Sequence, residues 1–169
     1  MKSRPSLAAV TALALLAAVG VAGARSSDRR QPIDIEGGSA VYSTDDSRPT
    51  VLSGGVTITQ GTLRITASTA EITMRNGEAV RAVLRGGPVR MSQQLDDGTP
   101  MSSVSSAADY DMKADVVVFS GNVGIQQPRG SLSGDRVTYN MRSGQVASGG
   151  AAGGGRVKMR ILPKNSGTP

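Results

Sequence analysis

The chain has 169 residues and a formal net charge of +6, with 19 lysines and arginines, 13 aspartates and glutamates, and neither cysteine nor histidine. Without cysteine there is no disulfide and no thiolate, and without histidine the commonest general base and metal ligand is missing. This composition disfavours an enzyme, a cofactor site or a metal site. A nucleic-acid partner is disfavoured too, because the basic residues are scattered and only one Phe and three Tyr could stack on bases.

The N-terminal segment has the pattern of a secretory signal. Lys2 and Arg4 precede an apolar run over 7–21, and small residues at 22–24 provide a cleavage site. The run is shorter than the roughly 20 strongly apolar residues of a membrane span, and polar sequence follows at once. We expect residues 1–24 to be a cleaved signal peptide, residues 25–162 to be one domain and residues 163–169 to be a flexible tail. A retained anchor is the alternative.

Beyond residue 30, apolar and polar residues alternate with the period of two that is typical of half-buried strands. The clearest alternating runs are 33–36, 56–59, 63–67, 70–74, 137–141 and 157–161. Residues that favour turns separate them at Asn76-Gly77, Gly86-Gly87-Pro88, Asp97-Gly98 and Ser143-Gly144, and a glycine-rich loop is expected over 149–155. The sequence therefore predicts an all-β fold of short strands.

An internal repeat organises these strands. Residues 52–80 align without gaps with residues 119–147, at an offset of 67, and eight pairs are identical where chance gives about two. Val56 corresponds to Val123, Ile58 to Ile125, and the apolar pattern also agrees. A strand-turn-strand unit therefore occurs twice, and each copy is expected to bury its apolar face against its neighbour.

Two shapes are compatible with stacked units of this kind. One is a closed sandwich with a filled interior, and the other is an open β-jelly roll whose interior is a groove. Few aromatic residues are available to fill an interior, and many inward positions are Val, Ile, Ala or Met. Small and flexible walls favour a groove that accepts a ligand, but a lean, filled core explains the composition equally well.

Three segments carry a resemblance to a known family: QPIDIEGG at 31–38, LSGGVTITQGTLRITA at 52–67 and ADYDMKADVVVFSGNVGIQQPRGSLSGDRVTY at 108–139. Together they resemble the LptA family, also called OstA-like, over nearly the whole chain from residue 31 to about 163. The resemblance implies a twisted, open β-jelly roll in the periplasm, whose apolar groove shields the lipid A acyl chains of lipopolysaccharide. It also implies a bridge in which LptC at the N-terminal edge passes lipopolysaccharide on, LptD receives it at the C-terminal edge, and copies associate head to tail.

By the same resemblance, Ile33, Tyr110 and Met112 match apolar family positions, and Met91 stands where relatives often have an aromatic ring. We expect the groove to be lined by the inward residues of the alternating runs, although each of these residues alone is more often plain core. They are Ile33, Ile35, Val56, Ile58, Leu63, Ile65, Ile72, Met74, Met91, Tyr110, Met112, Val123 and Ile125.

The two terminal strands are the expected partner edges, since an unpaired edge offers free N–H and C=O groups. These edges comprise Ile33, Asp34 and Ile35 at one end and Val157, Lys158, Met159 and Ile161 at the other. Basic residues at the second end could instead protect it against pairing.

The other charged residues can be explained without a metal, catalytic or binding role. Asp45-Asp46 and Asp96-Asp97 lie in turn-like sequence, and nothing nearby completes a ligand set for Asp109 and Asp111. Arginines such as Arg142 could meet lipid phosphates, but scattered surface arginine is ordinarily solvated. Two other functions stay open: an LptC-like or other edge-pairing structural module without lipid carriage, and a solenoid enzyme on a polysaccharide, for which no converging carboxylates are visible.

Overall fold

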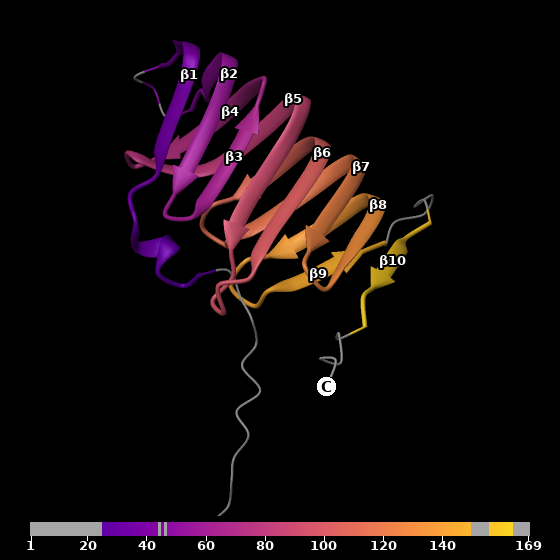
Figure 1. Cartoon of the computed structure of the whole chain (residues 1–169). Coiled ribbons are helices and arrows are strands. Elements are labelled where there is room, and N and C mark those ends of the chain that lie inside the picture. Colours follow the sequence, from indigo (N-terminus) through magenta and orange to yellow (C-terminus); the bar gives the residue numbers. More distant parts are fainter. Residues whose placement is uncertain (1–24, 44, 46, 150–155, 164–169) are drawn as a thin grey trace, which may run out of the picture.

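The computed structural model describes residues 25–43, 45, 47–149 and 156–163. These residues form one antiparallel sheet of ten strands, preceded by a short 3₁₀ helix (Figure 1). The elements are η1 (Asp28–Arg30), β1 (Asp34–Val41), β2 (Thr50–Gln60), β3 (Leu63–Ala67), β4 (Thr69–Arg75), β5 (Glu78–Gln94), β6 (Pro100–Asp111), β7 (Val116–Gln127), β8 (Gly130–Asn140), β9 (Gln145–Ser148) and β10 (Lys158–Ile161). The predicted all-β fold is confirmed. The predicted signal peptide, and most of the predicted glycine-rich loop and tail, lie outside the described residues.

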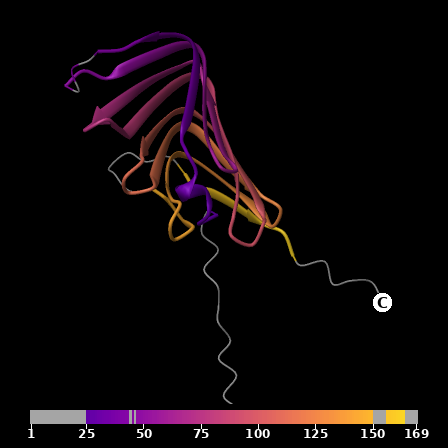
Figure 2. The same ribbon diagram turned by 90° about the vertical axis from the view of Figure 1, so that its left-hand side faces the viewer.

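The sheet folds over on itself into two layers that meet along one side and diverge along the other, like a V (Figure 2). Its order is β1-β2-β3-β5-β6-β7-β8-β10, while β4 pairs with β2 and β5, and β9 pairs with β8. β2 pairs with β3 through one end and with β4 through the other, and β8 pairs in the same way with β10 and β9. Long strands therefore run through both layers.

Glycine and serine residues form the corner of the V. Gly54 and Gly121, which are repeat equivalents, have φ values of 76° and 73°, in a region that is costly for other residues. The backbones of β1 and β2 also approach closely there, because a Cβ on Gly38 would lie 2.8 Å from the Gly54 carbonyl oxygen. β3 and β4 are two halves of one strand interrupted at Ser68, whose N–H faces the carbonyls of residues 85 and 86.

One predicted break is wrong. Gly86-Gly87-Pro88 does not separate two strands, because β5 runs through it. Both glycines adopt positive φ, at 73° and 103°, and the pairing register shifts between Arg85 and Val89. The two glycines thus form the part of the corner that lies in β5. They make an irregularity inside one long strand.

The duplication is confirmed by the strand pairing. Ile58 faces Ile65 across β2 and β3, and the equivalent pair 67 residues later, Ile125 and Leu132, faces across β7 and β8. Leu52 opposite Ala70 is matched in the same way by residues 119 and 137. The two copies therefore repeat the pairing register as well as the sequence.

Between the two layers the interior is packed at its centre. Tyr110, Tyr139 and Phe119 are the largest side chains there, and each is at most 1% exposed. Apolar residues of both layers surround them in one continuous cluster. The filled core and the groove are thus both present, since the centre is filled and the diverging side of the V is open.

Candidate functional site

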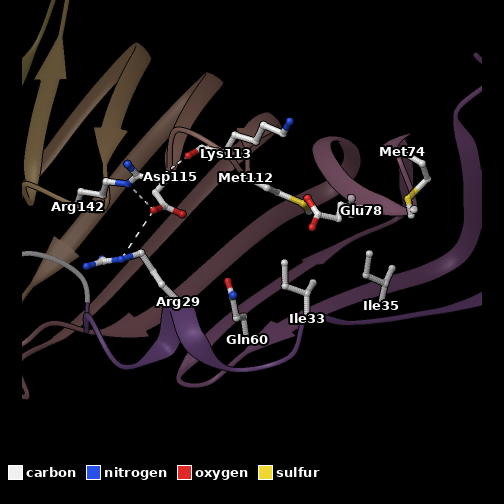
Figure 3. A pocket seen from close by; sticks show the side chains of 12 residues that line it. Arg29, Ile33, Ile35, Gln60, Met74, Glu78, Met112, Lys113, Asp115 and Arg142 are labelled. Carbon is white, nitrogen blue, oxygen red and sulfur yellow. Dashed lines mark hydrogen bonds and ion pairs between the residues drawn. The ribbon is translucent and has the colours of Figure 1, made fainter. Parts of the chain in front are cut away.

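The open side of the V contains a cavity of about 790 Å³, here called the mouth. It lies between β1 on one layer and the β4–β5 and β6–β7 turns on the other (Figure 3). One part of its wall is apolar and consists of Ile33, Ile35, Met74, Ala79 and Met112. Arg29, Gln60, Glu78, Lys113, Asp115 and Arg142 form the polar part. The mouth is therefore amphipathic, with its apolar wall toward β1.

The predicted groove residues divide into three groups. Ile33, Ile35, Met74 and Met112 line the mouth and are half-buried. Ile125 lines a second cavity of about 200 Å³ at the C-terminal end of the sheet, together with Leu132, Val146, Met159 and Ile161. The remaining eight pack inside the central core: Val56, Ile58, Leu63, Ile65, Ile72, Met91, Tyr110 and Val123.

The segment 25–31, here called the strap, crosses the open side of the V next to the mouth (Figure 2). Arg25 is bonded to Gln94 through both backbone and side chain, and the Ser26 N–H donates to Asp96 Oδ1 at 2.7 Å. Further along, the Thr62 hydroxyl donates to Asp28, and Gln60 Nε2 donates to the carbonyl of Gln31 at 3.2 Å. These bonds fasten the strap to the layer that holds β2, β3 and the end of β5.

The strap covers part of the central core. It encloses a cavity of only about 10 Å³ with Leu63, Gln93, Tyr110 and Met141. Asp28 of the strap is itself buried, at 8% exposure, against Gly61 in the β2–β3 turn. The core is thus closed from solvent at the strap and opens toward the mouth on the β1 side.

Asp115 and two arginines form an ion cluster between the strap and the opposite layer. Asp115 lies in the β6–β7 turn and is 6% exposed. Arg142 Nε donates to Asp115 Oδ2 at 2.7 Å, and Arg29 Nε of the strap lies 3.8 Å from the same oxygen (Figure 3). The Asp115 carbonyl also accepts the Met141 N–H at 2.8 Å. The cluster joins the strap to the β6–β7 turn, which holds Asp115, and to the β8–β9 turn, which holds Arg142.

Two buried tyrosines face the centre of the core. Burial raises the pKa of Tyr139 to about 12, although a hydrogen bond from Gln93 Nε2 to its hydroxyl oxygen opposes the shift. Burial also raises the pKa of Tyr110, and Asp115 adds to that shift. Both phenols therefore stay neutral to a higher pH than an exposed tyrosine, because the apolar interior disfavours the charged form.

Acidic residues outside the cluster have structural roles. Asp45 and Asp97 cap their own turns by accepting from Ser47 and Thr99, which lowers the pKa of both carboxyls. A bidentate hydrogen bond from Arg81 lowers the pKa of Asp109. Among the described residues, no three acidic side chains are grouped to hold a metal ion.

β1 and β10 are end strands of the sheet, as predicted, and β9, which pairs only with β8, is a third end strand. Asp34 and Ile35 lie in β1 and Lys158, Met159 and Ile161 in β10, whereas Ile33 and Val157 just precede these strands. The expected half-burial of the last strand is wrong, because Val157, Met159 and Ile161 are 43%, 66% and 76% exposed. β10 pairs only with the first four residues of β8, so nothing in the described chain covers its outer side.

The sequence did not reveal the strap, Arg29 or Asp115. Arg29 lies five residues after the end of the expected signal peptide and has no periodic pattern around it. Asp115 stands alone between two strands, and only the folded register brings it beside Arg142. The sequence offers one hint of the ion cluster. Arg142 stands between the alternating run at 137–141 and the turn at Ser143-Gly144, at the end of a strand.

Comparisons with known proteins agree with this architecture. Residues 34–145 match the model of a family described as LptA/(LptD N-terminal domain) LPS transport protein. The chain is 36% identical over 137 residues to the lipopolysaccharide export system protein LptA of Escherichia coli K12, which covers 79% of this chain and 73% of that protein. It is 28% identical over 143 residues to the Haemophilus influenzae LptA, which covers 83% of this chain and 82% of that protein.

A solved structure is similar as well. This is LptH of Pseudomonas aeruginosa, described as the LptA homologous periplasmic component of the conserved lipopolysaccharide transport device. The TM-score is 0.72 at 25% sequence identity, over 81% of this chain and 99% of that one. In the part of the chain that the structure describes, no helix is long and apolar enough to cross a membrane.

Proposed function

Because the chain belongs to the LptA/(LptD N-terminal domain) family of LPS transport proteins, we propose that it carries lipopolysaccharide across the periplasm. The acyl chains of lipid A would be shielded from water at the mouth, while the polar part of the molecule stays solvated. The observation that carries this proposal is the apolar wall of Ile33, Ile35, Met74 and Met112, which leads from solvent to the central core.

The energetics of such a carrier need no catalytic group. Each methylene removed from water contributes about 0.8 kcal/mol, so ten methylenes contribute about 8 kcal/mol. Met74 and Met112 are flexible, polarizable side chains that can adapt to chains of different length. The wall packs against the core but is only half-buried, so a ligand chain could contact its exposed side without first unfolding the core.

The exposed terminal strands support a bridging role. We propose that β1 pairs with LptC, that β10 pairs with LptD, and that copies of the chain also associate head to tail. Pairing of this kind adds a strand to a sheet edge through main-chain hydrogen bonds. Met159 and Ile161 would then be covered, which removes two large apolar side chains from water. Lys158 and Arg160 would have to be accommodated by the partner.

The proposed division of the chain into a signal peptide, a carrier domain and a tail follows from the proposed export to the periplasm. Residues 1–24 would direct export and be cleaved, residues 25–162 would form the carrier domain, and residues 163–169 would be a tail. Cleavage would place the strap at the start of the mature chain, since the strap begins at Arg25.

A second candidate is an edge-pairing module, LptC-like or purely structural, that carries no lipid. The filled centre of the interior favours it, because eight of the thirteen proposed groove residues pack against one another. The two candidates differ in whether lipid contacts the mouth.

Site-specific photocrosslinking tests the proposal. A photoreactive amino acid at Ile35 or Met112 is expected to crosslink to lipopolysaccharide in growing cells. The matched control is the same probe at Val104, which is 37% exposed but lies outside both cavities. Crosslinks to neighbouring chains alone, with none to lipopolysaccharide at either mouth position, would favour the structural module.

A further inference from the structure

The polar end of the mouth contains more positive than negative groups. Arg29, Lys113 and Arg142 line it together with the carboxylate of Asp115, whereas the carboxylate of Glu78 lies farther along the mouth, beside Met112 (Figure 3). Arg29 and Arg142 both approach the same Asp115 oxygen, so two guanidinium groups share one carboxylate. Each guanidinium has five N–H donors, more than one carboxylate can accept, and both side chains are partly exposed, at 31% for Arg29 and 58% for Arg142.

Arg29 lines both the mouth and the small cavity under the strap, and one of its donors has no partner. Its Nη1 is buried and has no hydrogen-bond partner among the described residues, while its Nε lies 3.8 Å from Asp115, beyond hydrogen-bond length. Arg142, in contrast, donates to Asp115 and to the Lys113 carbonyl. A buried donor without an acceptor is costly, so an added acceptor at this nitrogen would be stabilising, and the three basic side chains around Asp115 favour an anionic one.

The apolar wall begins beside this cluster. Figure 3 shows Met112, Ile33 and Ile35 following Asp115 and Arg29 along the mouth, with the two guanidinium groups together at the other end. A ligand that fills the mouth would therefore place an anionic group at the arginines and a hydrocarbon chain on the wall. Guanidinium groups bind phosphate oxygens in bidentate fashion, and a phosphate could accept from those donors of Arg29 and Arg142 that do not face Asp115.

We propose that Arg29 and Arg142, with Lys113 at the rim, form a head-group site for the phosphate of an amphiphile whose hydrocarbon chain lies on the Ile33–Ile35–Met112 wall. This site rests on the proposed carrier function and adds the chemical class of the head group. It also gives the strap a role in binding, because Arg29 belongs to the strap and can reach the site only while the strap is in place.

The test compares two amphiphiles that have the same chain and different heads. Dodecyl phosphate and dodecyl maltoside are titrated, both below their micelle concentrations, into the chain from residue 25 to residue 169 in a calorimeter. Inorganic phosphate is titrated separately to detect binding of the ion without a chain. The protein is expected to bind dodecyl phosphate about tenfold more tightly than dodecyl maltoside, as charge-assisted hydrogen bonds to one phosphate would give.

Arg29→Gln is the informative variant, because Arg142 remains to pair with Asp115 and the fold is kept. It is expected to remove most of the preference for dodecyl phosphate and to leave dodecyl maltoside binding unchanged. Arg142→Gln should act in the same direction. Arg75→Gln is the matched control, since Arg75 is the equivalent of Arg142 in the first repeat but does not line the mouth. Arg25→Gln loosens the strap at its other end without altering the cluster.

The outcomes separate the head-group site from the carrier function. Equal binding of both amphiphiles by the unaltered chain would overturn the head-group site and leave the carrier intact. Equal loss of both in Arg29→Gln and Arg25→Gln would show that Arg29 acts only by holding the strap, which also overturns the site. If inorganic phosphate binds as tightly as dodecyl phosphate, the hydrocarbon chain contributes nothing. The arginines would then bind any phosphate ion, and the head-group site for an amphiphile would be overturned. Binding of neither amphiphile would contradict the carrier function itself.

Discussion

Asp28 of the strap packs directly against Gly61 in the β2–β3 turn, so closely that any side chain on Gly61 would collide with the Asp28 carboxylate. Gly61 has a φ of +59°, which a residue with a side chain seldom adopts. The turn therefore needs glycine for two reasons, its own backbone and the position of the strap above it.

Comparing Gly61→Ala with Gly98→Ala separates the backbone requirement from the contact with Asp28. We expect Gly61→Ala to release the strap, so that amides 25–31 exchange with deuterium much faster, and to lower the free energy of unfolding by about 1–3 kcal/mol. Gly98→Ala is the control, since Gly98 has a φ of +78° but nothing within 4 Å of its added Cβ. Equal exchange in the strap of both variants would mean that the contact with Asp28 does not hold it.

Truncating two isoleucines to alanine distinguishes a residue that packs in the core from a residue that lines the mouth. Ile65 is 1% exposed in the central core, whereas Ile35 is half-buried at the mouth. Ile65→Ala is expected to cost about 2–5 kcal/mol of unfolding free energy, and Ile35→Ala less than about 1.5 kcal/mol. Lipid binding should follow the opposite order, measured on variants that remain folded. A larger stability loss in Ile35→Ala would place that residue in the core.

The alkaline limit of stability should reflect the buried tyrosines. Because burial favours the neutral phenol, the pKa of Tyr139 is raised to about 12 from its ordinary value of 10.0. The unfolded chain therefore ionises first, so the contribution of Tyr139 to the free energy of unfolding should be constant below about pH 10 and fall as the pH rises toward 12. Denaturant titrations across this range, with tyrosinate absorbance followed in parallel, measure the effect. Tyr139→Phe should show a shallower decline, and an unchanged slope would contradict the assignment.

The C-terminal edge should control self-association. Met159→Asp with Ile161→Asp places charge on two exposed side chains of β10, so the stability of the isolated chain should change by less than about 0.5 kcal/mol. Concentration-dependent oligomers should be lost, as measured by sedimentation velocity. Val51→Asp is the comparison, because Val51 is also exposed, at 41%, but lies in an interior strand of the sheet. Oligomers that persist in the β10 variant would remove this edge from the interface.

The sequence predicted the repeating part of the molecule well, because alternation and the offset of 67 residues report directly on which side chains face inward. The pairing of Ile58 with Ile65 and of Ile125 with Leu132 follows from that pattern. The corner was harder to predict, since Gly86-Gly87-Pro88 has the composition of a turn and only the pairing of neighbouring strands keeps β5 continuous.

The site was predictable only in part, for a related reason. Periodicity marks inward residues but does not distinguish a core residue such as Ile58 from a mouth residue such as Met112, which depends on how far the layers diverge. The ion cluster joins residues 29, 115 and 142, and no local pattern connects positions so distant in the chain.

Binding of lipopolysaccharide by the folded chain tests the central claim most directly. The unaltered chain should retain lipopolysaccharide during gel filtration, and Ile33→Asp and Met112→Asp should each weaken its binding at least about tenfold while the far-ultraviolet β spectrum is kept. Val104→Asp, which places the same charge outside both cavities, should bind as the unaltered chain does. Full binding by both mouth variants, with their fold intact, would contradict the assignment of the mouth as the lipid site.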